Sequence, residues 1–297
     1  MRCTKPIWLE QYSLSVPCGK CIACRIARTS EWSVRLMNEA EVHDHSSFVT
    51  LTYRKENLPD DGSISKRELQ LFLKRLRKQL EPRKIRFYAC GEYGDPDRPQ
   101  SIELGLTSGR PHYHLIIYGL APSEHEFMSS YAQEARAIEG PVVDAWQGRG
   151  FVYVGTVTYN SVRYVAKYVQ KKLYGQRAEE YEGRQPPFAL MSKGLGKFYA
   201  LANSHDIVER GGVYRQGKNV GIPRYYKKLY EDYAEGPDLK QRLEEQAQER
   251  KEEVRERLKF PVEIEDLETY EDFGVALGES QTQRGVHLKK KKELYGT

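Results

Sequence analysis

Two histidines placed two residues apart are the first feature of this chain that can do chemistry. His112 and His114 lie in a run of Leu, Ile and Tyr that favours a strand, bracketed by an Arg-Pro pair and by Gly119. Side chains two apart on a strand project from the same face. Both imidazoles can therefore bind one metal ion. The alternative is a structural role, which is the more frequent one for two histidines in a strand.

A second reactive stretch lies downstream, at residues 164–172, and contains two tyrosines and three lysines. On a helix its valines and alanine form one apolar stripe, while Tyr164, Lys167, Tyr168 and Lys171 share the other side. The two tyrosines, four residues apart, lie one above the other. A core helix with tyrosines at its rim explains the stripe, but not why two phenols and two ammonium groups share the opposite face. A phenol beside an ammonium group is a candidate nucleophile.

Four of the five cysteines lie at the start of the chain, at Cys3, Cys18, Cys21 and Cys24. Two C-x-x-C spacings that share Cys21, with a fourth thiol nearby, favour a tetrahedral Zn²⁺ site that holds together a segment too short for its own core. The alternative is a set of reduced thiols without metal.

The elements that must position these residues can be predicted in the first half of the chain. Arg- and Glu-rich residues Ile26 to Glu41 favour a helix. A capping box, Ser65 with Glu68, precedes leucines at helical spacing. The expected strands run from Phe48 to Tyr53 and from Lys84 to Cys90, and the histidine strand follows.

A carboxylate is expected beside the histidines. If the strand that ends near Glu92 pairs as a hairpin with the histidine strand, Glu92 comes opposite His112 and His114. Glu103, in the intervening loop, is a weaker candidate because a loop fixes it poorly.

Further elements complete the expected fold. A capping box, Ser123 with Glu126, predicts a helix toward Ala137, and residues 151–158 predict a fourth strand. The order strand, helix, strand, strand, helix, strand is that of an α+β, ferredoxin-like antiparallel sheet, with the tyrosine helix appended. RNA-recognition domains share this order, so the fold alone does not decide the function.

The expected organisation has four parts: a Cys-rich segment and helix (1–45), the catalytic core (46–178), a basic and aromatic loop region packed on it (179–235), and a charged helix with a disordered tail (236–297). In the third part, residues 191–197 and 221–228 are expected to be loops.

Composition restricts the function only weakly. The 297 residues carry a net charge of +5, which permits a nucleic-acid partner without requiring one. No run approaches 18 apolar residues and no signal peptide is recognisable, which predicts a soluble intracellular protein without a membrane partner. The 21 tyrosines against 9 phenylalanines suit partly wet surfaces such as base-stacking platforms. The candidate DNA contacts are Lys74, Arg75, Lys78, Arg110, Lys172 and Arg224, with solvated surface positions as the alternative.

These motifs together resemble a known family. The strand at 48–53, the histidine strand and the paired-tyrosine helix are similar, in order, to the three motifs of HUH endonucleases, the rolling-circle replication initiators. The sequences at 17–21 (Pro-Cys-Gly-Lys-Cys), 91–94 (Gly-Glu-Tyr-Gly), 164–168 (Tyr-Val-Ala-Lys-Tyr) and 223–226 (Pro-Arg-Tyr-Tyr) extend the resemblance to initiators of gokushovirus-type single-stranded DNA phages, within the microviruses.

The resemblance implies a metal-dependent, site- and strand-specific nicking of viral origin DNA. His112, His114 and Glu92 would hold Mg²⁺ or Mn²⁺, and a tyrosine would form a 5′-phosphotyrosine and leave a free 3′-OH. The second tyrosine would later transfer or rejoin the strand, and Lys167 and Lys171 would favour the phenolate or bind phosphates. Host helicase and DNA polymerase are the expected partners, in the cytoplasm of the bacterial host.

Three other functions remain open from the sequence. A plasmid initiator, relaxase or transposase would use the same motifs. A non-enzymatic binder of RNA or single strands would place aromatic side chains on the open sheet face and have no metal at the histidines. A nucleotide hydrolase would need another nucleophilic histidine close by, and none is apparent.

Overall fold

The structure is a computed structural model. It describes residues 3–94, 109–128, 134–168, 181, 183–215 and 217–233, and a few single positions between 241 and 248. Within this part, the chain divides into two compact units, Arg35–Tyr199 and Met1–Val34 with Ala200–Thr297. Among the described residues, no helix combines the length and the apolar character that a bilayer crossing requires.

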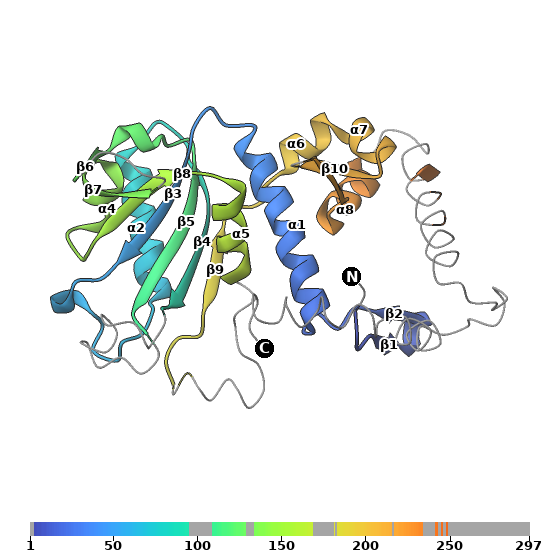
Figure 1. Cartoon of the computed structure of the whole chain (residues 1–297), viewed down its shortest axis with the longest axis horizontal. Helices are drawn as coiled ribbons and strands as arrows, with labels where there is room; N and C mark the ends of the chain where they lie inside the picture. Colours follow the sequence, from blue (N-terminus) through green and yellow to red (C-terminus); the bar gives the residue numbers. More distant parts are fainter. Residues whose placement is uncertain are drawn as a thin grey trace. The chain divides into compact units, whose positions relative to one another are not determined.

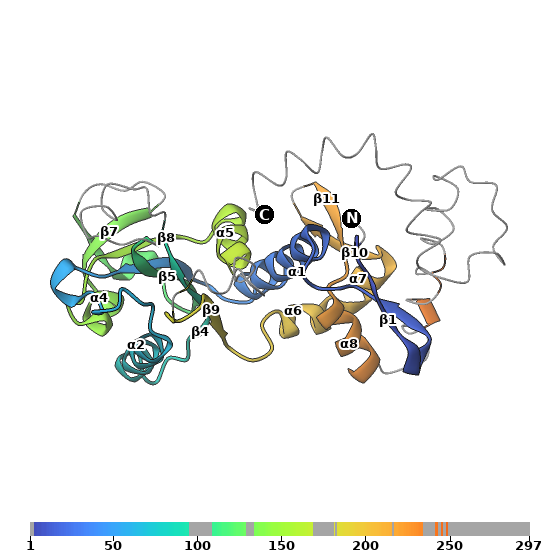
Figure 2. The same cartoon turned by 90° about the horizontal axis from the view of Figure 1, so that it is seen from below.

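The described elements are strands, α-helices and short 3₁₀ turns (Figures 1 and 2). The strands are β1 (Ile7–Leu9), β2 (Leu14–Val16), β3 (Ser46–Thr52), β4 (Arg86–Tyr93), β5 (Pro111–Tyr118), β6 (Glu126–Phe127), β7 (Glu134–Glu139), β8 (Val152–Thr156), β9 (Phe188–Met191), β10 (Gly212–Arg215) and β11 (Lys218–Gly221). The α-helices are α1 (Ile22–Ala40), α2 (Lys66–Gln79), α4 (Pro141–Trp146), α5 (Tyr159–Tyr168), α6 (Lys197–Ala202), α7 (Ser204–Glu209) and α8 (Arg224–Tyr233). The 3₁₀ turns are η1 (Glu10–Tyr12), η2 (Lys55–Asn57) and η3 (Pro122–Glu124).

A seven-stranded antiparallel sheet forms the centre of the unit Arg35–Tyr199. Its strand order is β6-β7-β8-β3-β5-β4-β9, and each neighbouring pair runs antiparallel. The four central strands occur in the chain as strand, helix, strand, strand, helix, strand. The predicted α+β class with a large antiparallel sheet is confirmed.

The two faces of this sheet differ. On one face α2 and α4 pack on the main core, which includes Leu51, Leu115 and Trp146, and α5 lies on the opposite side of the sheet (Figures 1 and 2). The end of α1 joins this second face, where the Tyr118 hydroxyl donates to the Leu36 carbonyl at 2.9 Å. The second face is the one that carries the histidines.

Helix α2 shows why the sequence could predict its elements so well. The Ser65 side chain accepts the Glu68 backbone N–H, as a helix cap should. Leu69, Phe72, Leu73 and Leu76 are buried at helical spacing. The helix predicted at 26–41 is confirmed as α1, which begins four residues earlier.

The helix predicted from Ser123 toward Ala137 is wrong. Glu124 instead closes the turn η3, where its Oε1 accepts the Ala121 backbone N–H at 2.8 Å. The segment then forms β6 and β7, because Ala135 and Ala137 alternate inward and pair with β8. Strand pairing thus overrides local helix propensity, and the helix begins later, at Pro141.

The loops predicted at 191–197 and 221–228 are also wrong in part. Met191 ends β9, Lys197 begins α6, and residues from Arg224 onward form α8. In α8 the buried side chains Tyr226, Leu229 and Tyr230 recur at helical spacing among lysines. The charged helix predicted from residue 238 and the tail lie almost wholly outside the described residues.

In the unit that combines the N-terminal segment with residues from Ala200 onward, two hairpins, β1-β2 and β10-β11, accompany α7 and α8. The Tyr230 hydroxyl donates to the Ala200 carbonyl at 3.0 Å. The Arg224 backbone N–H donates to the Glu31 carboxylate at 3.3 Å.

A buried carboxylate joins α1 to the sheet. Glu39 is fully buried, and its oxygens lie 2.7 Å from Arg86 Nε, 3.0 Å from His43 Nε2 and 2.7 Å from the Gly196 backbone nitrogen. Burial raises the pKa of Glu39, but the hydrogen bonds from His43 and Gly196 and the charge of Arg86 outweigh it and hold the pKa below its ordinary value. The carboxylate is therefore ionised at neutral pH.

We expect Glu39→Ala to lower the free energy of unfolding by about 3 kcal/mol, because it leaves Arg86 without its buried counter-charge. Urea denaturation at pH 7 measures the change. Since the folded pKa lies below the unfolded one, this stabilisation exists above pH 4.5 and is lost as pH falls through the folded pKa. The gap between the two proteins should therefore narrow in acid. Exposed Glu56→Ala serves as the control, with a change within about 0.5 kcal/mol; equal effects of both substitutions would contradict the assignment.

Candidate active site

Three adjacent strands bring the predicted metal ligands to one face of the sheet. On β4 and β5, Glu92 lies directly opposite His112, as the sequence predicted. Across the other edge of β5, Thr50 of β3 lies opposite His114. Since the side-chain period of a strand is two, the pairing register alone places these four side chains together.

The three predicted ligands are within reach of one ion. Glu92 Oε1 lies 2.9 Å from His112 Nε2 and 3.2 Å from His114 Nε2. The two imidazole rings stand nearly perpendicular, at 86°, with their centroids 4.8 Å apart. One ligand atom from each of the three residues lies within 4.8 Å of the others.

Second partners fix both imidazoles. His112 Nδ1 lies 2.9 Å from the Arg110 carbonyl, which can only accept, so Nδ1 carries the hydrogen. In the neutral ring, His112 Nε2 then has a lone pair that points at the Glu92 carboxylate. A cation bound between the two atoms would satisfy both, as would a proton. His114 Nδ1 lies 3.0 Å from the Thr50 hydroxyl, which leaves Nε2 of His114 directed toward the same carboxylate.

The carboxylate of this group is almost fully buried, since Glu92 is 2% exposed. Burial raises the pKa of Glu92, but hydrogen bonds to His112 and His114 outweigh it and leave the pKa below its ordinary value. The site therefore offers one anionic oxygen ligand and two nitrogen ligands. This donor set fits Mn²⁺ or Mg²⁺.

The tyrosine helix lies against this site. The Tyr164 ring is 5.0 Å from the His114 ring, edge to face at 83°, and the side chain is 42% exposed. Val162, Val165 and Ala166 are fully buried, which confirms the predicted apolar stripe. Lys167 is half-buried on the same helix. A solvent-accessible phenol therefore lies beside the histidines.

The start of α5 is set by a local hydrogen-bond pair. The Ser161 backbone N–H donates to the Thr158 hydroxyl at 3.1 Å, and the Thr158 backbone N–H donates to the Ser161 hydroxyl at 2.8 Å. These bonds satisfy backbone groups that the first helical turn leaves without partners. They fix the point at which the chain leaves β8 and thereby place Tyr164.

Several predicted site residues cannot be placed. The side chain of Tyr168, all of Lys171 and Lys172, and Glu103 lie outside the described residues.

The predicted DNA contacts are dispersed. Lys74 and Lys78 are exposed on α2, and Arg224 is exposed at the start of α8. Arg75 instead donates from Nε to the Ala145 carbonyl at 2.9 Å and so holds α4 against α2. Arg110 follows the site most closely, since its own carbonyl holds His112, and its Nε is buried with no hydrogen-bond partner among the described residues.

Sequence reasoning missed Thr50. The available signal was the alternation along β3, because residues 48, 50 and 52 share the face of the histidines. Phe48 also stacks on His114, with ring centroids 5.8 Å apart.

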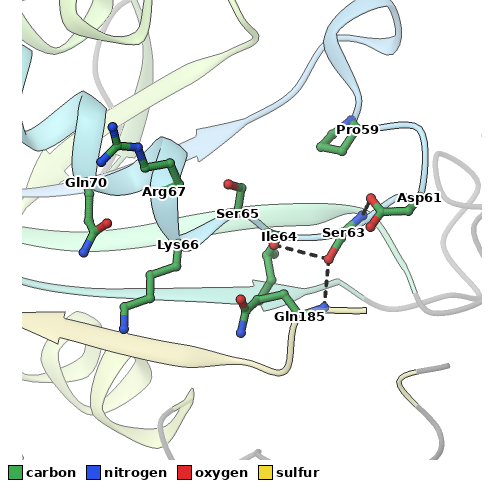
Figure 3. Close-up of a pocket in the computed structure, with 9 residues that line it drawn as sticks. All are labelled: Pro59, Asp61, Ser63, Ile64, Ser65, Lys66, Arg67, Gln70 and Gln185. Carbon is green, nitrogen blue, oxygen red and sulfur yellow. Dashed lines mark hydrogen bonds between the residues drawn. The ribbon is translucent and has the colours of Figure 1, made fainter. Parts of the chain in front are cut away.

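A pocket of about 590 Å³ lies at the start of α2, lined among others by Ser65, Lys66, Arg67 and Gln185 (Figure 3). None of the predicted site residues lines it. The Tyr93 hydroxyl, one residue beyond Glu92, lies 3.2 Å from Ser63 at its edge.

The predicted zinc ligands also come together. Cys3, Cys18, Cys21 and Cys24 place their Sγ atoms within 4.8 Å of one another.

A sheet carrying a His-His-Glu cluster beside an exposed tyrosine defines a candidate metal-dependent site, and comparison with known proteins indicates its class. The family model for replication-associated proteins of the ORF2 type matches residues 46–173, which include β3, β5 and α5. The resemblance to phage replication proteins is confirmed. No solved structure gives a significant match.

Individual relatives come from three bacterial viruses. The chain is 29% identical over 290 residues to replication-associated protein ORF2 of Spiroplasma virus 4, covering 93% of this chain and 84% of that protein. It is 29% identical over 237 residues to replication-associated protein VP4 of Bdellovibrio phage phiMH2K, covering 76% and 71%. It is 29% identical over 233 residues to replication-associated protein ORF4 of Chlamydia phage 1, covering 74% of this chain and 55% of that protein.

We expect Thr50→Val to weaken Mn²⁺ binding by about 10- to 100-fold, because the variant keeps the side-chain shape but removes the bond that orients His114. Titration followed by the electron paramagnetic resonance signal of free Mn²⁺ measures the affinity.

The matched control is Thr52→Val. Thr52 lies opposite His112 on the same face, but its hydroxyl donates to the Phe151 carbonyl at 3.4 Å and to no imidazole. Its affinity should equal that of the unmodified protein, and equal affinities in all three proteins would remove Thr50 from the site.

Proposed function

We propose that this chain is a rolling-circle replication initiator that nicks viral origin DNA by tyrosine transesterification. The observation that carries the proposal is the 5.0 Å contact between the Tyr164 ring and the His114 ring. It brings a candidate nucleophile to a candidate metal site, although the two are 50 residues apart in the chain. The replication-associated names of the phage relatives support the same role.

Glu92, His112 and His114 would hold the divalent cation, Mg²⁺ or Mn²⁺. When bound, such an ion acts as a Lewis acid that withdraws charge from the oxygens of the scissile phosphate. Two nitrogens and one carboxylate favour Mn²⁺ in affinity. The buried, ionised Glu92 and the orientation of the rings by Thr50 and by the Arg110 carbonyl preorganise this group.

The chain's own residues would perform the transfer. Tyr164 Oη forms a bond to phosphorus as the bond from phosphorus to the 3′ oxygen breaks, and the phenol proton is released while the 3′ oxygen gains one. The products are a 5′-phosphotyrosine and a free 3′-OH, which a polymerase can extend. A free phenol has a pKa near 10, so a cation near it is needed. Lys167, three residues on along α5, is placed to favour the phenolate or a bound phosphate.

The second tyrosine gives the cycle its other half. Tyr168 follows Tyr164 by about one helical turn, and Lys171 follows Tyr168 at the same spacing as Lys167 follows Tyr164. One tyrosine would hold the DNA end while the other makes the next cut and the strand is transferred. The phosphodiester energy stays in the covalent link, so rejoining needs no ATP.

Candidate DNA contacts surround this chemistry. Arg110 lies next to the histidines with a buried guanidinium nitrogen that lacks a hydrogen-bond partner among the described residues, which suits a phosphate oxygen. Lys74, Lys78, Lys172 and Arg224 are further candidates, and Arg75 is less suitable because its Nε is engaged by α4. Host helicase and polymerase would act on the nicked origin in the bacterial cytoplasm. The sheet order is consistent with the HUH endonuclease fold.

A non-enzymatic RNA or single-strand binder is less well supported. That function needs exposed aromatic side chains on the sheet. On the histidine-bearing face of the described strands, however, Phe48, Tyr88 and Tyr118 are buried, with exposures of 7%, 0% and 0%.

We expect Tyr164→Phe and Tyr168→Phe each to retain some nicking and the double variant to retain none. The assay incubates the protein with Mn²⁺ and labelled single-stranded origin DNA, and covalent adducts are counted as label that migrates with the protein on a denaturing gel. Phenylalanine preserves packing and removes only the nucleophilic oxygen.

The matched control is Tyr159→Phe, on the same helix but five residues before Tyr164 and so on another side. It should form adducts at the unmodified level. A double variant at 164 and 168 that still forms the adduct would refute the nucleophile assignment.

We expect His112→Ala and His114→Ala each to abolish metal-dependent cleavage while origin binding persists, because the surface that contacts the phosphate backbone stays in place. Binding is measured by fluorescence anisotropy with the same labelled DNA. Unchanged nicking by either variant would exclude the proposed metal site.

A further inference from the structure

The N-terminal segment has no core of its own. From Cys3 to Ile22 no described side chain is buried, and the hairpin β1-β2 exposes Trp8 by 49% and Tyr12 by 67%. An isolated two-stranded hairpin is at best marginally stable in water. Something other than hydrophobic burial must hold it.

Four thiols meet at the base of this hairpin. Cys3 precedes β1, Cys18 and Cys21 follow β2, and Cys24 lies in the first turn of α1. Their Sγ atoms all lie within 4.8 Å of one another, and those of Cys3 and Cys21 are 3.8 Å apart. Tetrahedral Zn²⁺ with bonds of about 2.3 Å requires sulfur atoms about 3.8 Å apart. The cluster therefore has the size of a zinc site.

Backbone geometry around the sulfurs fits thiolate ligands. The Cys18 backbone N–H donates to Cys3 Sγ at 3.2 Å, and the Cys21 backbone N–H donates to Cys18 Sγ at 3.3 Å. The second bond closes a tight turn in which Gly19 has φ +72°, a conformation that favours glycine. The Arg28 guanidinium lies near Gly19, at 3.8 Å from the position that a Cβ would take, and provides positive charge beside the cluster.

We propose that Cys3, Cys18, Cys21 and Cys24 bind one structural Zn²⁺ that fixes the hairpin β1-β2 to the start of α1. All four positions are taken by protein sulfur, so the site leaves no open position for substrate and serves folding rather than catalysis. The proposal is independent of the nicking function, because it uses none of the residues at the histidine cluster.

The first test is metal content. Full-length protein purified under reducing conditions should contain one zinc per chain by mass spectrometry, released when a mercurial reagent titrates four thiols. Replacing zinc by Co²⁺ should produce the sulfur-to-metal charge-transfer absorption typical of tetrahedral thiolate coordination. A protein that neither contains zinc nor gives this absorption would refute the site, as would a disulfide among the four cysteines.

Variants assign the metal to the cluster. Cys3→Ser, Cys18→Ser and Cys21→Ser should each lose the bound zinc. Cys90→Ala, which removes the one remaining cysteine of the chain, and the double variant His112→Ala/His114→Ala should both keep it. Zinc retained in the first group, or lost in the second, would contradict the assignment.

The structural role has its own readout. On removal of zinc, amide hydrogen exchange of peptides from residues 3–21 should accelerate strongly, since the hairpin loses its only proposed anchor, while peptides from β3 and β4 stay protected. Unchanged exchange in residues 3–21 would mean that the metal does not hold the hairpin.

Discussion

The pairing register of β3, β5 and β4 is the constraint on which the rest of the candidate site depends. It places Thr50, His114, His112 and Glu92 on one face, with buried apolar residues such as Leu115 on the other. A slip of one residue would turn every side chain of β5 to the opposite face and would bury the imidazoles in the main core. The core therefore fixes the chemistry, because the same alternation that hides Tyr113, Leu115 and Ile117 presents the histidines.

The opposite face of β5 reinforces this register with polar bonds. The Tyr113 hydroxyl accepts the Ser65 backbone N–H at 2.8 Å and lies 2.7 Å from the Tyr53 hydroxyl, which in turn donates to Glu68. Arg149 completes the network at 2.6 Å from Glu68. Burial raises the pKa of Tyr53 well above its ordinary value, so this phenol is a hydrogen-bond donor and not a nucleophile. Burial thus distinguishes it from the exposed Tyr164.

Sequence reasoning succeeded where information was local. The cap at Ser65, the spacing of leucines in α2 and the hairpin that brings Glu92 to His112 depend on short-range patterns, and all three are confirmed. It failed at residues 123–137, where a capping-box pattern is overridden by pairing of β7 with β8. It could not find the bond from Thr50 to His114 or the ion pair of Glu39 with Arg86, since each joins residues distant in the chain. Chain spacing carries no record of such contacts.

The place of α5 in the chain has a mechanical consequence. The helix that carries Tyr164 directly follows β8, which is an interior strand bonded to β7 on one side and to β3 on the other. Tension on a DNA end attached to Tyr164 would therefore enter the sheet through β8. Pulling that strand along its axis loads two ladders of backbone hydrogen bonds together in shear, and does not peel a free edge one bond at a time. The anchoring of α5 suits a protein that stays attached to a strand while other enzymes draw on it.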